Sequence, residues 1–432
     1  MIFYKETNFK KEPSIGEIPT DWEIIKLGDE SVSEIVMGQS PPSSTYNKKG
    51  IGLPFLQGKM EFGEIYPKAL VYCSEPIKIA QPNDILISVR APVGDVNLAP
   101  CKLCIGRGLA AIRFNDKLAN YLFYFYYFQK IKTRLEMLGK GSTFKAIDKD
   151  DLESLMIPLP PVEEQRVIAG VLGVVDSVIA KTDEVIAKTE RLKKGLMQTL
   201  LTRGIGHKEF KETEIGKIPK TWQVVRLADI TIKIKDMDHR MPAKHPSGIP
   251  FVSIRYMLKY PDFGFTIRFD DPDLEFIRKE DFESQISRFN VEEQDILYSR
   301  FGSIGHAKLV ITDQPFLASY SIVLVKPDKS KVLPEFLTCA LNSERTRKQA
   351  KLQTKGATNR NLHLEDIQNL KIPLPPAAEQ QKIAEIIVAI DRKLELEKTK
   401  KAKLERVKRG LMDLLLTGKV RVKVDCGAVC SC

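Results

Sequence analysis

The chain has 432 residues, a formal net charge of +11 and a hydrophobic content of 43%. No apolar run approaches the roughly 20 residues of a membrane-spanning helix, and no signal-like leader is present, so we expect a soluble cytoplasmic protein without a membrane partner. Its single Cys-x-x-Cys pair, Cys101 and Cys104, has no second pair and no histidines at ligand spacing, which excludes a complete zinc site.

The opening segment of the chain occurs twice. Residues 15–22 read Ile-Gly-Glu-Ile-Pro-Thr-Asp-Trp, and residues 215–222 read Ile-Gly-Lys-Ile-Pro-Lys-Thr-Trp. A proline-rich segment is duplicated as well, because Ile-Pro-Leu-Pro-Pro at 157–161 returns at 372–376, each time followed shortly by Glu-Gln. We therefore expect two copies of one structural unit, with shared borders and different interiors.

The interior of each copy predicts a mixed α+β globule. Apolar runs bounded by Gly, Pro or Asn-Asp are typical of strands. They occur at 84–89 and 109–114 in the first copy and at 295–299 and 322–325 in the second. A helix rich in aromatic residues is expected from Tyr121 to Tyr127, with a weaker counterpart from Pro334 onward.

A basic segment followed by a small-residue turn comes next in each copy. Cationic side chains precede a Lys-Gly-[Ser/Ala]-Thr turn that combines exposed N–H groups with a hydroxyl, a combination suited to phosphate oxygens. The candidate phosphate-binding residues are Lys132, Lys140, Ser142 and Thr143 in the first copy and Arg347, Lys355, Thr358 and Arg360 in the second. A solvated helix face before a tight turn explains the same pattern, and both interpretations stay open.

A long helix should follow each proline motif, beginning near 161 and near 376, because the prolines favour an extended approach and a helix start. In the first helix the apolar period predicts a coiled-coil seam along Ile168, Val171, Val175, Val178, Thr182, Val185, Thr189, Leu192 and Leu196. In the second helix the seam follows Ile383, Ile387, Ile390, Leu394, Leu404, Val407, Leu411 and Leu414, with a charged interval at Glu397 and Lys401.

A helix of this length with a narrow apolar stripe cannot stand alone in water. Its matching length and helix ends favour antiparallel pairing with the other copy, although each helix could instead cap its own globule. The expected segments are 1–156 and 207–371 for the two globular domains, 157–206 for the central helix and 372–432 for the C-terminal helix and tail. Similar segments before each opening motif further predict that the two chain ends lie near each other, as in a broken ring.

Base-reading side chains would have to come from the two divergent interiors. The candidates are Lys59, Arg90 and Arg107 in the first copy and Arg255, Arg300 and Asn359 in the second. Arg90 and Arg300 follow equivalent Asp-Ile-Leu strands at comparable positions. Either arginine could instead form an internal ion pair.

Motifs of catalysis are missing from the sequence. A phosphate-binding loop needs Gly-x-x-x-x-Gly-Lys-[Ser/Thr], which residues 139–143 do not supply. The Ser-Pro-Pro at 40–42 lacks the aromatic residue expected of an amino-methyltransferase, and no acidic-x-Lys triplet completes a nuclease-like metal site. We therefore predict a non-catalytic chain with no cofactor or metal of its own.

These features in this order resemble the DNA specificity subunit of type I restriction-modification systems. The features are the duplicated Ile-Pro-Leu-Pro-Pro-x-x-Glu-Gln signature, the Gly-Leu-Met helix ends at 195–197 and 410–412, the Ile-Gly-x-Ile-Pro-x-x-Trp openings and the Lys-Gly-[Ser/Ala]-Thr turns. The resemblance covers essentially the whole chain. It implies two target-recognition domains, each reading one half of a split site in double-stranded DNA, with antiparallel coiled-coil helices as the spacer. It also implies assembly with DNA-methyltransferase (modification) subunits and with restriction/translocase subunits.

Two other functions would fit parts of the pattern. A two-headed protein-interaction scaffold would use both globules to bind proteins, and DNA binding with a linear salt dependence would distinguish it from a DNA-binding subunit. An enzyme fragment would bind a cofactor as an isolated chain. The leading prediction is a non-catalytic, sequence-specific DNA-binding subunit.

Overall fold

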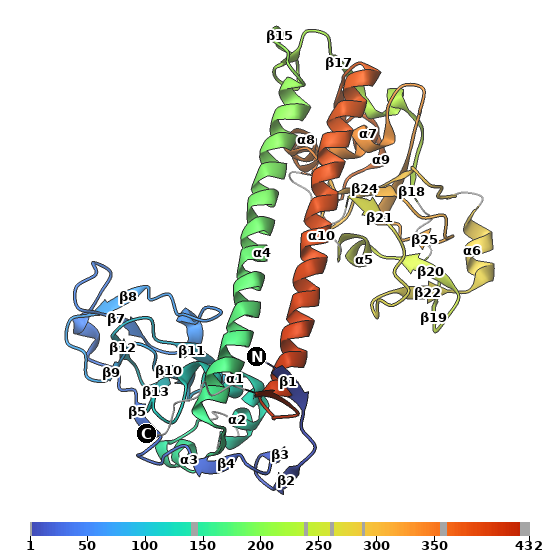
Figure 1. The fold of residues 1–432 in the computed structure, drawn as a ribbon. Helices are drawn as coiled ribbons and strands as arrows, with labels where there is room; N and C mark the ends of the chain where they lie inside the picture. Colours follow the sequence, from blue (N-terminus) through green and yellow to red (C-terminus); the bar gives the residue numbers. More distant parts are fainter. Residues whose placement is uncertain are drawn as a thin grey trace. The chain divides into compact units, whose positions relative to one another are not determined.

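The structure is a computed structural model that describes residues 2–139, 146–236, 241–259, 263–286, 290–354 and 361–423. The chain divides into two compact units, of which the first comprises Met1–Lys181 and Lys401–Cys432 and the second comprises Thr182–Lys400. Each unit contains two sheets, several short helices and part of both long helices (Figure 1). Within the described ranges, no helix is both long enough and apolar enough to cross a membrane.

The first unit is built on a four-stranded and a five-stranded sheet. The four-stranded sheet has the order β11 (Val96–Leu98), β10 (Ile85–Ser88), β13 (Leu109–Phe114) and β5 (Ser33–Met37). The five-stranded sheet has the order β6 (Tyr46–Asn47), β8 (Val71–Cys73), β7 (Leu53–Leu56), β12 (Leu103–Ile105) and β9 (Ile79–Ala80). Strand pairs are formed by β2 (Phe9–Glu12) with β3 (Gly16–Pro19) and by β4 (Glu23–Lys26) with β14 (Met156–Leu159). The helices are α1 (Tyr121–Lys130), α2 (Lys132–Leu138) and α3 (Lys149–Glu153), with short 3-10 turns at Ser43–Thr45 and Lys59–Glu61.

The second unit repeats this plan with different lengths. Its five-stranded sheet has the order β18 (Thr231–Asp236), β26 (Ile322–Pro327), β23 (Ile296–Ser299), β24 (Ala307–Val310) and β21 (Gly264–Phe265). Its four-stranded sheet has the order β19 (Lys244–His245), β22 (Glu275–Ile277), β20 (Ile249–Val252) and β25 (Leu317–Ala318). Strand pairs are formed by β15 (Phe210–Lys211) with β16 (Ile218–Pro219) and by β17 (Gln223–Arg226) with β27 (Lys371–Leu374). The helices are α5 (Ile254–Lys259), α6 (Lys279–Ile286), α7 (Pro334–Leu341), α8 (Glu344–Gln353) and α9 (Leu364–Gln368), with a 3-10 turn at Leu227–Ile230.

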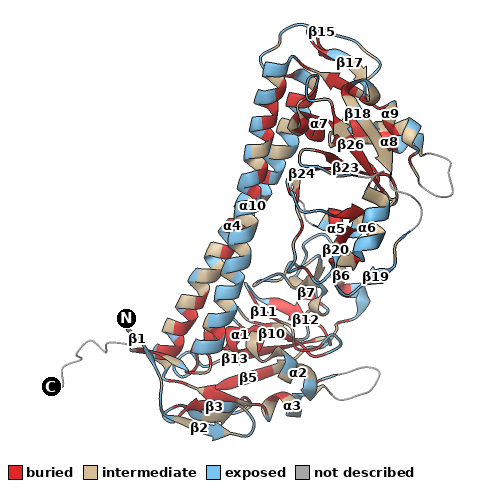
Figure 2. Cartoon of the chain, turned by 90° about the vertical axis from the view of Figure 1, so that its right-hand side faces the viewer, coloured by how far each residue is buried: buried red, intermediate tan, exposed pale blue. Residues whose placement is uncertain are grey.

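The predicted strands form the buried centre of each unit, as the red ribbons of β10, β13, β23 and β26 indicate (Figure 2). All four residues of β10 and all four of β23 are buried. Helix α1 adds six buried aromatic side chains to the core of the first unit, whereas α7 adds one, Phe336, to the second. The mixed α+β prediction and its strand positions are confirmed.

The strand registers align the two units residue by residue. Ser88 of β10 pairs with Leu109, and Ser299 of β23 pairs with Ile322. One residue later, the Val89 N–H donates to the Gly108 carbonyl at 3.0 Å, and the Arg300 N–H donates to the Ser321 carbonyl at 3.0 Å. Arg300 therefore corresponds to Val89 and not to Arg90. The expected equivalence of Arg90 and Arg300 is wrong by one residue, which in a strand places the two side chains on opposite faces.

Both long helices begin where the proline motifs predict. The motif strands β14 and β27 pair with β4 and β17, and α4 (Val162–Arg203) and α10 (Ala377–Leu415) follow directly. In the first unit Asp176 of α4 binds Lys408 of α10, with 2.6 Å between Oδ1 and Nζ. In the second unit Lys193 of α4 forms an ion pair with Asp391 of α10. Early residues of one helix thus meet late residues of the other, so the predicted antiparallel pairing is confirmed (Figure 1).

The seam of α4 differs from the predicted one at Val185 and Leu192. Ile179, Thr182 and Thr189 are less than 10% exposed, whereas Val185 and Leu192 are 36% and 55% exposed. The seam steps from Thr189 to Lys193 because Lys193 pairs with Asp391 inside the interface. The apolar period alone does not reveal the ion pair between Lys193 and Asp391. It therefore predicts the neighbouring Leu192 as the seam residue.

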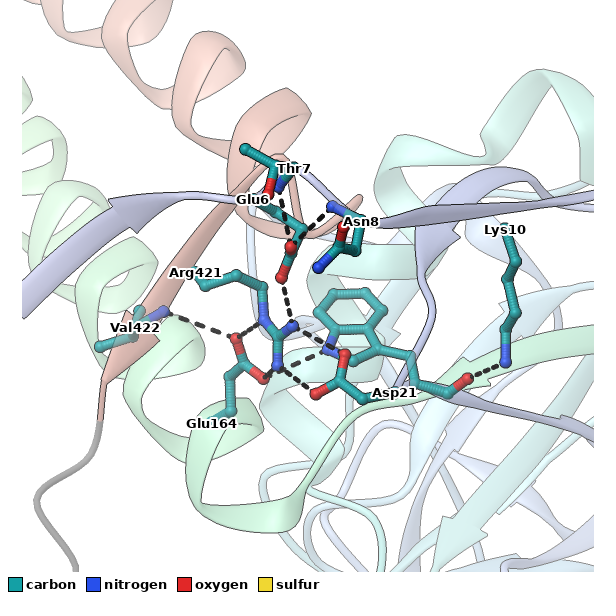
Figure 3. A network of polar contacts seen from close by, with 9 residues as sticks. Glu6, Thr7, Asn8, Lys10, Asp21, Glu164, Arg421 and Val422 are labelled. Carbon is teal, nitrogen blue, oxygen red and sulfur yellow. Dashed lines mark hydrogen bonds and ion pairs between the residues drawn. The ribbon is translucent and has the colours of Figure 1, made fainter.

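A strand pair joins the two ends of the chain within the first unit. Strand β1 (Ile2–Lys5) runs antiparallel to β28 (Val420–Lys423), which confirms the predicted proximity of the ends. From β28 the Arg421 guanidinium donates to Glu164 at 2.7 Å, to Asp21 at 2.8 Å and to Glu6 at 2.9 Å (Figure 3). Burial opposes the charge of Arg421, but its hydrogen bonds to Glu164 and Asp21 outweigh this effect and raise its pKa above the usual value.

The second unit contains the same junction with a different cation. In the first unit the Trp22 indole N–H donates to Glu164, which lies in the first turn of α4, at 3.2 Å. In the second unit the Trp222 indole N–H donates to Glu379, in the first turn of α10, at 2.9 Å. His207, from the segment after α4, lies 2.8 Å from the same carboxylate and takes the place of Arg421. The duplicated tryptophans and glutamates of the sequence therefore fix the start of each long helix.

Candidate nucleic-acid interface

The end of one central strand in each unit lies beside the chain that follows the small-residue turn. Arg90, just after β10, forms an isolated antiparallel bridge with Ala146. Phe301, just after β23, forms the corresponding bridge with Asn361. Seven of the predicted contact residues fall in the intervening turns, outside the described residues: Lys140, Ser142, Thr143, Lys355, Thr358, Asn359 and Arg360. In each unit the bridge therefore brings the strand end beside the first described residue after the predicted turn.

Two predicted DNA-binding lysines of the first unit share one carboxylate. Lys59 and Lys132 place their Nζ atoms 2.5 Å and 2.6 Å from the two oxygens of Asp95. The Asp95 N–H donates to the Ser88 hydroxyl at 2.9 Å, which anchors the loop between β10 and β11. Burial alone would raise the pKa of Asp95, but hydrogen bonds from Lys132 and Lys59 outweigh it and lower the pKa. Both lysines therefore support the loop that begins with Arg90.

Arg347 has the corresponding role in the second unit. Its Nε donates to the Gly305 carbonyl at 3.2 Å and its Nη2 to Asn342 at 2.8 Å. The same Nη2 lies 3.2 Å from Nδ1 of His306, which occupies the position of Asp95 because its N–H donates to the Ser299 hydroxyl. Burial and the nearby Arg347 charge both lower the pKa of His306. Arg347 is thus held against the loop between β23 and β24.

Arg300 faces the interior of its unit. It is 5% exposed, forms an ion pair with Asp236 at the end of β18, and directs its Nε toward Asn361 at 3.4 Å. An internal ion pair was the alternative interpretation of this arginine, and it describes the observed geometry. The guanidinium still borders the strand end, because it lies over the Phe301 ring with 5.2 Å to the ring centroid.

The three remaining candidates are exposed. Arg90 follows β10, Arg107 lies in the turn between β12 and β13, and Arg255 lies in α5. Among the residues that the structure describes, no ion-pair partner is recorded for Arg90 or Arg107. The Ser40 hydroxyl accepts a hydrogen bond from the Arg107 backbone N–H at 3.2 Å, which fixes the turn while the side chain stays outside.

Two aromatic residues at the strand end of the second unit were missed by sequence reasoning. The rings of Phe301 and Tyr320 are in edge contact, with 5.4 Å between centroids and 79° between planes. Tyr320 corresponds to Arg107, because both turns close through matching bonds, Leu109 N–H to Gly106 carbonyl and Ile322 N–H to Ser319 carbonyl. Alignment of the repeat on its strands, with Ser88 matched to Ser299, would have found both aromatic residues.

The second unit also contains a cavity of about 1010 Å³ between the long helices, α7, α8 and β24. In the first unit the Tyr126 hydroxyl donates to Oδ2 of Asp176 at 2.8 Å. Cys339 occupies the position of Tyr126, because α1 and α7 start with matching hydrogen bonds to Gln165 and Gln380. Both Cys339 and Asp391 line the cavity, and Oδ2 of Asp391 has no hydrogen-bond partner among the described residues. Cys339 therefore does not give Asp391 the hydroxyl partner that Tyr126 gives to Asp176 in the other unit.

The repeat matches one protein family in both copies. The model of the type I restriction modification DNA specificity domain matches residues 19–191 and again residues 219–406. Each match covers one set of sheets together with part of the long helix that follows it.

Individual proteins support the same assignment. The putative type I restriction enzyme MjaX specificity subunit of Methanocaldococcus jannaschii is 55% identical over 199 residues, which is 46% of this chain and 47% of that protein. The type I restriction enzyme MjaVIII specificity subunit of the same organism is 28% identical over 429 residues, which is 98% of each. The crystal structure of a type I restriction-modification system S subunit from M. genitalium shares the fold with a TM-score of 0.61 and 18% identity, covering 95% of this chain and 99% of that one. The chain belongs to the family of type I restriction-modification DNA specificity subunits, which recognise the DNA target and are non-catalytic.

Proposed function

We propose that the chain reads a split target in double-stranded DNA, one half-site per unit, and joins modification and restriction subunits into one complex. The observation that carries this proposal is the repeated scaffold with different side chains at matched positions. Sheets, proline motifs and tryptophan junctions recur, whereas the strand ends carry the exposed Arg90 in one unit and the half-buried Phe301 in the other. Such a frame suits the recognition of two unrelated half-sites.

The paired helices would act as the spacer between half-sites. Helix α4 has 42 residues and α10 has 39, each long enough to serve as a rod. The ion pairs Asp176–Lys408 and Lys193–Asp391 fix the register of one helix against the other. A fixed register is what a spacer of constant length requires.

Contacts with DNA would divide between phosphate and base. The lysines of the two turns, Lys140 and Lys355, would contact phosphates, with Ser142, Thr143, Thr358, Asn359 and Arg360 beside them in the same segments. The exposed Arg90, Arg107 and Arg255 would face the bases. Lys59, Lys132, Arg300 and Arg347 would position these surfaces through their contacts with Asp95, Asp236 and Gly305.

Partners of the chain follow from the same assignment. The relatives are named as subunits of restriction enzymes, and a solved structure with a TM-score of 0.54 and 19% identity is titled as a study of complex assembly of the type I system. We expect DNA-methyltransferase (modification) subunits and restriction/translocase subunits to bind this chain. Co-purification of the full chain with each subunit type would test these partners separately.

Binding of the full chain to duplex DNA tests the proposal. A duplex pool of random sequence should yield a target with two fixed segments separated by a constant number of unspecified base pairs. The log of the binding constant should fall linearly with the log of the salt concentration. A pool that yields no sequence, or binding to proteins alone, would favour the interaction scaffold instead.

The proposed phosphate contacts have a test of their own. Replacing both Lys140 and Lys355 by Ala should weaken binding to target and scrambled duplexes alike. Loss of two phosphate contacts should reduce the slope of the salt dependence by about two. If the salt slope is unchanged and the variant no longer discriminates target from scrambled duplexes, the turn lysines would read bases. That result would contradict the proposal that the turns contact phosphates and the strand ends contact bases.

A further inference from the structure

Resting on the proposed DNA-binding function, we infer that the units read their half-sites by different chemistry: Arg90 and Arg107 bind guanine acceptors, and Phe301 and Tyr320 bind thymine methyl groups. The chemical class of each ligand is a base edge in the major groove. The guanine edge presents the N7 and O6 acceptors, and the thymine edge presents its C5 methyl group.

The backbone places the two pairs at matched positions. Arg90 and Phe301 each form the isolated bridge that follows the central strand. Arg107 and Tyr320 each lie in the turn that leads into the neighbouring strand, β13 or β26. The contact between Phe301 and Tyr320 shows that side chains at these two positions meet across the strands. The same two positions in the first unit therefore hold two arginines.

A pair of arginines at this place needs a ligand. Like charges opposite each other on neighbouring strands are destabilising. Among the described residues of the first unit, neither guanidinium has a recorded ion-pair partner, and both side chains are exposed. Asp95, in the same loop as Arg90, does not supply the missing anion, since Lys59 and Lys132 already occupy both of its carboxylate oxygens. Guanine supplies two acceptors in the bidentate geometry that arginine prefers.

The aromatic pair of the second unit is half-buried, and Phe301 packs against the Arg300 guanidinium. Phe301 lies between the Tyr320 ring at 5.4 Å and the Arg300 guanidinium at 5.2 Å, measured to ring centroids. Arg300 is itself fixed by Asp236. The first unit has no counterpart of this support, because Val89 and Met37 occupy the positions of Arg300 and Asp236. The buried ion pair between Arg300 and Asp236 therefore supports the aromatic pair Phe301 and Tyr320 from the interior side.

Base analogues in the selected target provide the test. In binding assays with the full chain, each guanine is replaced by 7-deazaguanine and each thymine by uracil, one position at a time. We expect 7-deazaguanine to weaken binding about fivefold at a position in one half-site, because the N7 acceptor of a bidentate arginine contact is lost while O6 remains. We expect uracil to weaken binding about threefold in the other half-site, because one methyl contact is lost.

Variants assign each penalty to a side chain. Arg90→Ala and Arg107→Ala should abolish the 7-deazaguanine penalty and leave the uracil penalty unchanged. Phe301→Ala and Tyr320→Ala should do the reverse, and Phe301→Leu, which keeps an apolar side chain, should retain part of the uracil penalty. Lys117→Ala and Ile232→Ala, at exposed positions of the first and second units, serve as matched controls that should alter neither.

Three results would overturn the inference. Penalties that persist in the variants would mean that other side chains read these bases. Tighter binding to mismatched steps without a uracil penalty would mean that the aromatic pair wedges between bases rather than contacting methyl groups. A chain that binds no duplex at all would overturn the proposed function itself, which separates that failure from a wrong choice of reading residues.

Discussion

At the scale of single residues, Asp95 determines how firmly the strand end of the first unit is held. It receives Lys59 and Lys132 through its two carboxylate oxygens and donates its N–H to Ser88. Lys59 and Lys132 therefore bind the Asp95 carboxylate, while Ser88 accepts from the Asp95 backbone, so that three separate segments of the chain meet at this residue. The loop that starts at Arg90 depends on its charge.

We expect Asp95→Asn to destabilise the first unit by about 1 kcal/mol at pH 7, because two charge-assisted contacts are weakened. The pKa of Asp95 is lowered in the folded chain, so its contribution is present above the unfolded pKa of about 4 and is lost as the pH falls through the folded value. Thermal unfolding of wild type and variant across pH 3 to 7 measures this, with the exposed Asp116→Asn as control. A difference between the curves that does not shrink with acidification would exclude an ionic origin.

The sequence could predict that an arginine follows a central strand in each unit, but not on which face of the strand its side chain lies. Arg90 and Arg300 look alike in the sequence because both follow an Asp-Ile-Leu strand. Only the ladder register, in which Arg300 matches Val89, places one outside and the other inside. Arg90 lies six residues after its strand's aspartate and Arg300 lies five residues after its own. Because successive side chains of a strand point to opposite faces, this difference of one residue places the two arginines on opposite faces.

At the scale of elements, the paired helices combine an apolar seam with ion pairs such as Asp176–Lys408, Lys193–Asp391 and Glu190–Lys398. The existence and the start of α4 and α10 could be predicted, because the proline motifs and a sustained apolar period are strong signals of a helix. Their matching lengths and ends also predicted that they pair antiparallel. The exact seam could not, because Lys193 and Asp391 occupy seam positions as a pair. From sequence alone a charged residue is expected to face solvent, because its ion-pair partner on the other helix is not known.

Removing one partner of this pair should cost more than removing both. Lys193→Met leaves the 9% exposed Asp391 without its cation, and we expect a loss of about 2 kcal/mol. The double variant with Asp391→Leu should recover most of that loss, because two apolar side chains can pack in the interface. Urea unfolding of both single variants and the double variant forms a double-mutant cycle. Additive losses would mean that the two residues do not interact.

Lengthening the rod should change the target spacing and leave the half-sites unchanged. A seven-residue insertion in both α4 and α10, between seam positions, adds about two turns and roughly 10 Å. At about 3.4 Å per base pair, the selected target should gain about three unspecified base pairs. Insertions of four residues rotate the two halves of each helix against each other by about 40° and should bind poorly. Selection of the original spacing by the lengthened chain would refute the spacer.

At the scale of the whole chain, the closure of the ends depends on β28. Arg421 gathers Glu6, Asp21 and Glu164, which come from the N-terminal segment and from the start of α4. The equivalent junction of the second unit uses a continuous chain and His207. In the first unit the junction between the chain ends is noncovalent and depends on the buried guanidinium of Arg421. In the second unit the peptide backbone also connects the two sides of the junction.

We expect Arg421→Ala to release β1 and β28 from the first unit, because three carboxylates lose their common cation. Removing one partner from a buried ionic group typically costs about 3 to 5 kcal/mol. Limited proteolysis should then cut near residues 2–12 and 416–423, while His207→Ala should leave these sites protected. Protection of both ends in Arg421→Ala would show that the strand pairing alone closes the chain.

The cavity lined by Cys339 affects which part of the chain unfolds first. Tightly filled cores resist local unfolding, and side chains along a void lose dispersion partners on one side. Helix α1 packs six aromatic side chains into the core of the first unit, whereas α7 and α8 border about 1010 Å³ of space and, among the described residues, a carboxylate oxygen without a hydrogen-bond partner. Backbone amides of α7 and α8 should therefore exchange with deuterium sooner than those of α1 and α2. On mild heating the chain should pass through a state in which the second unit is partly unfolded while the first unit is still folded and able to bind its proposed half-site.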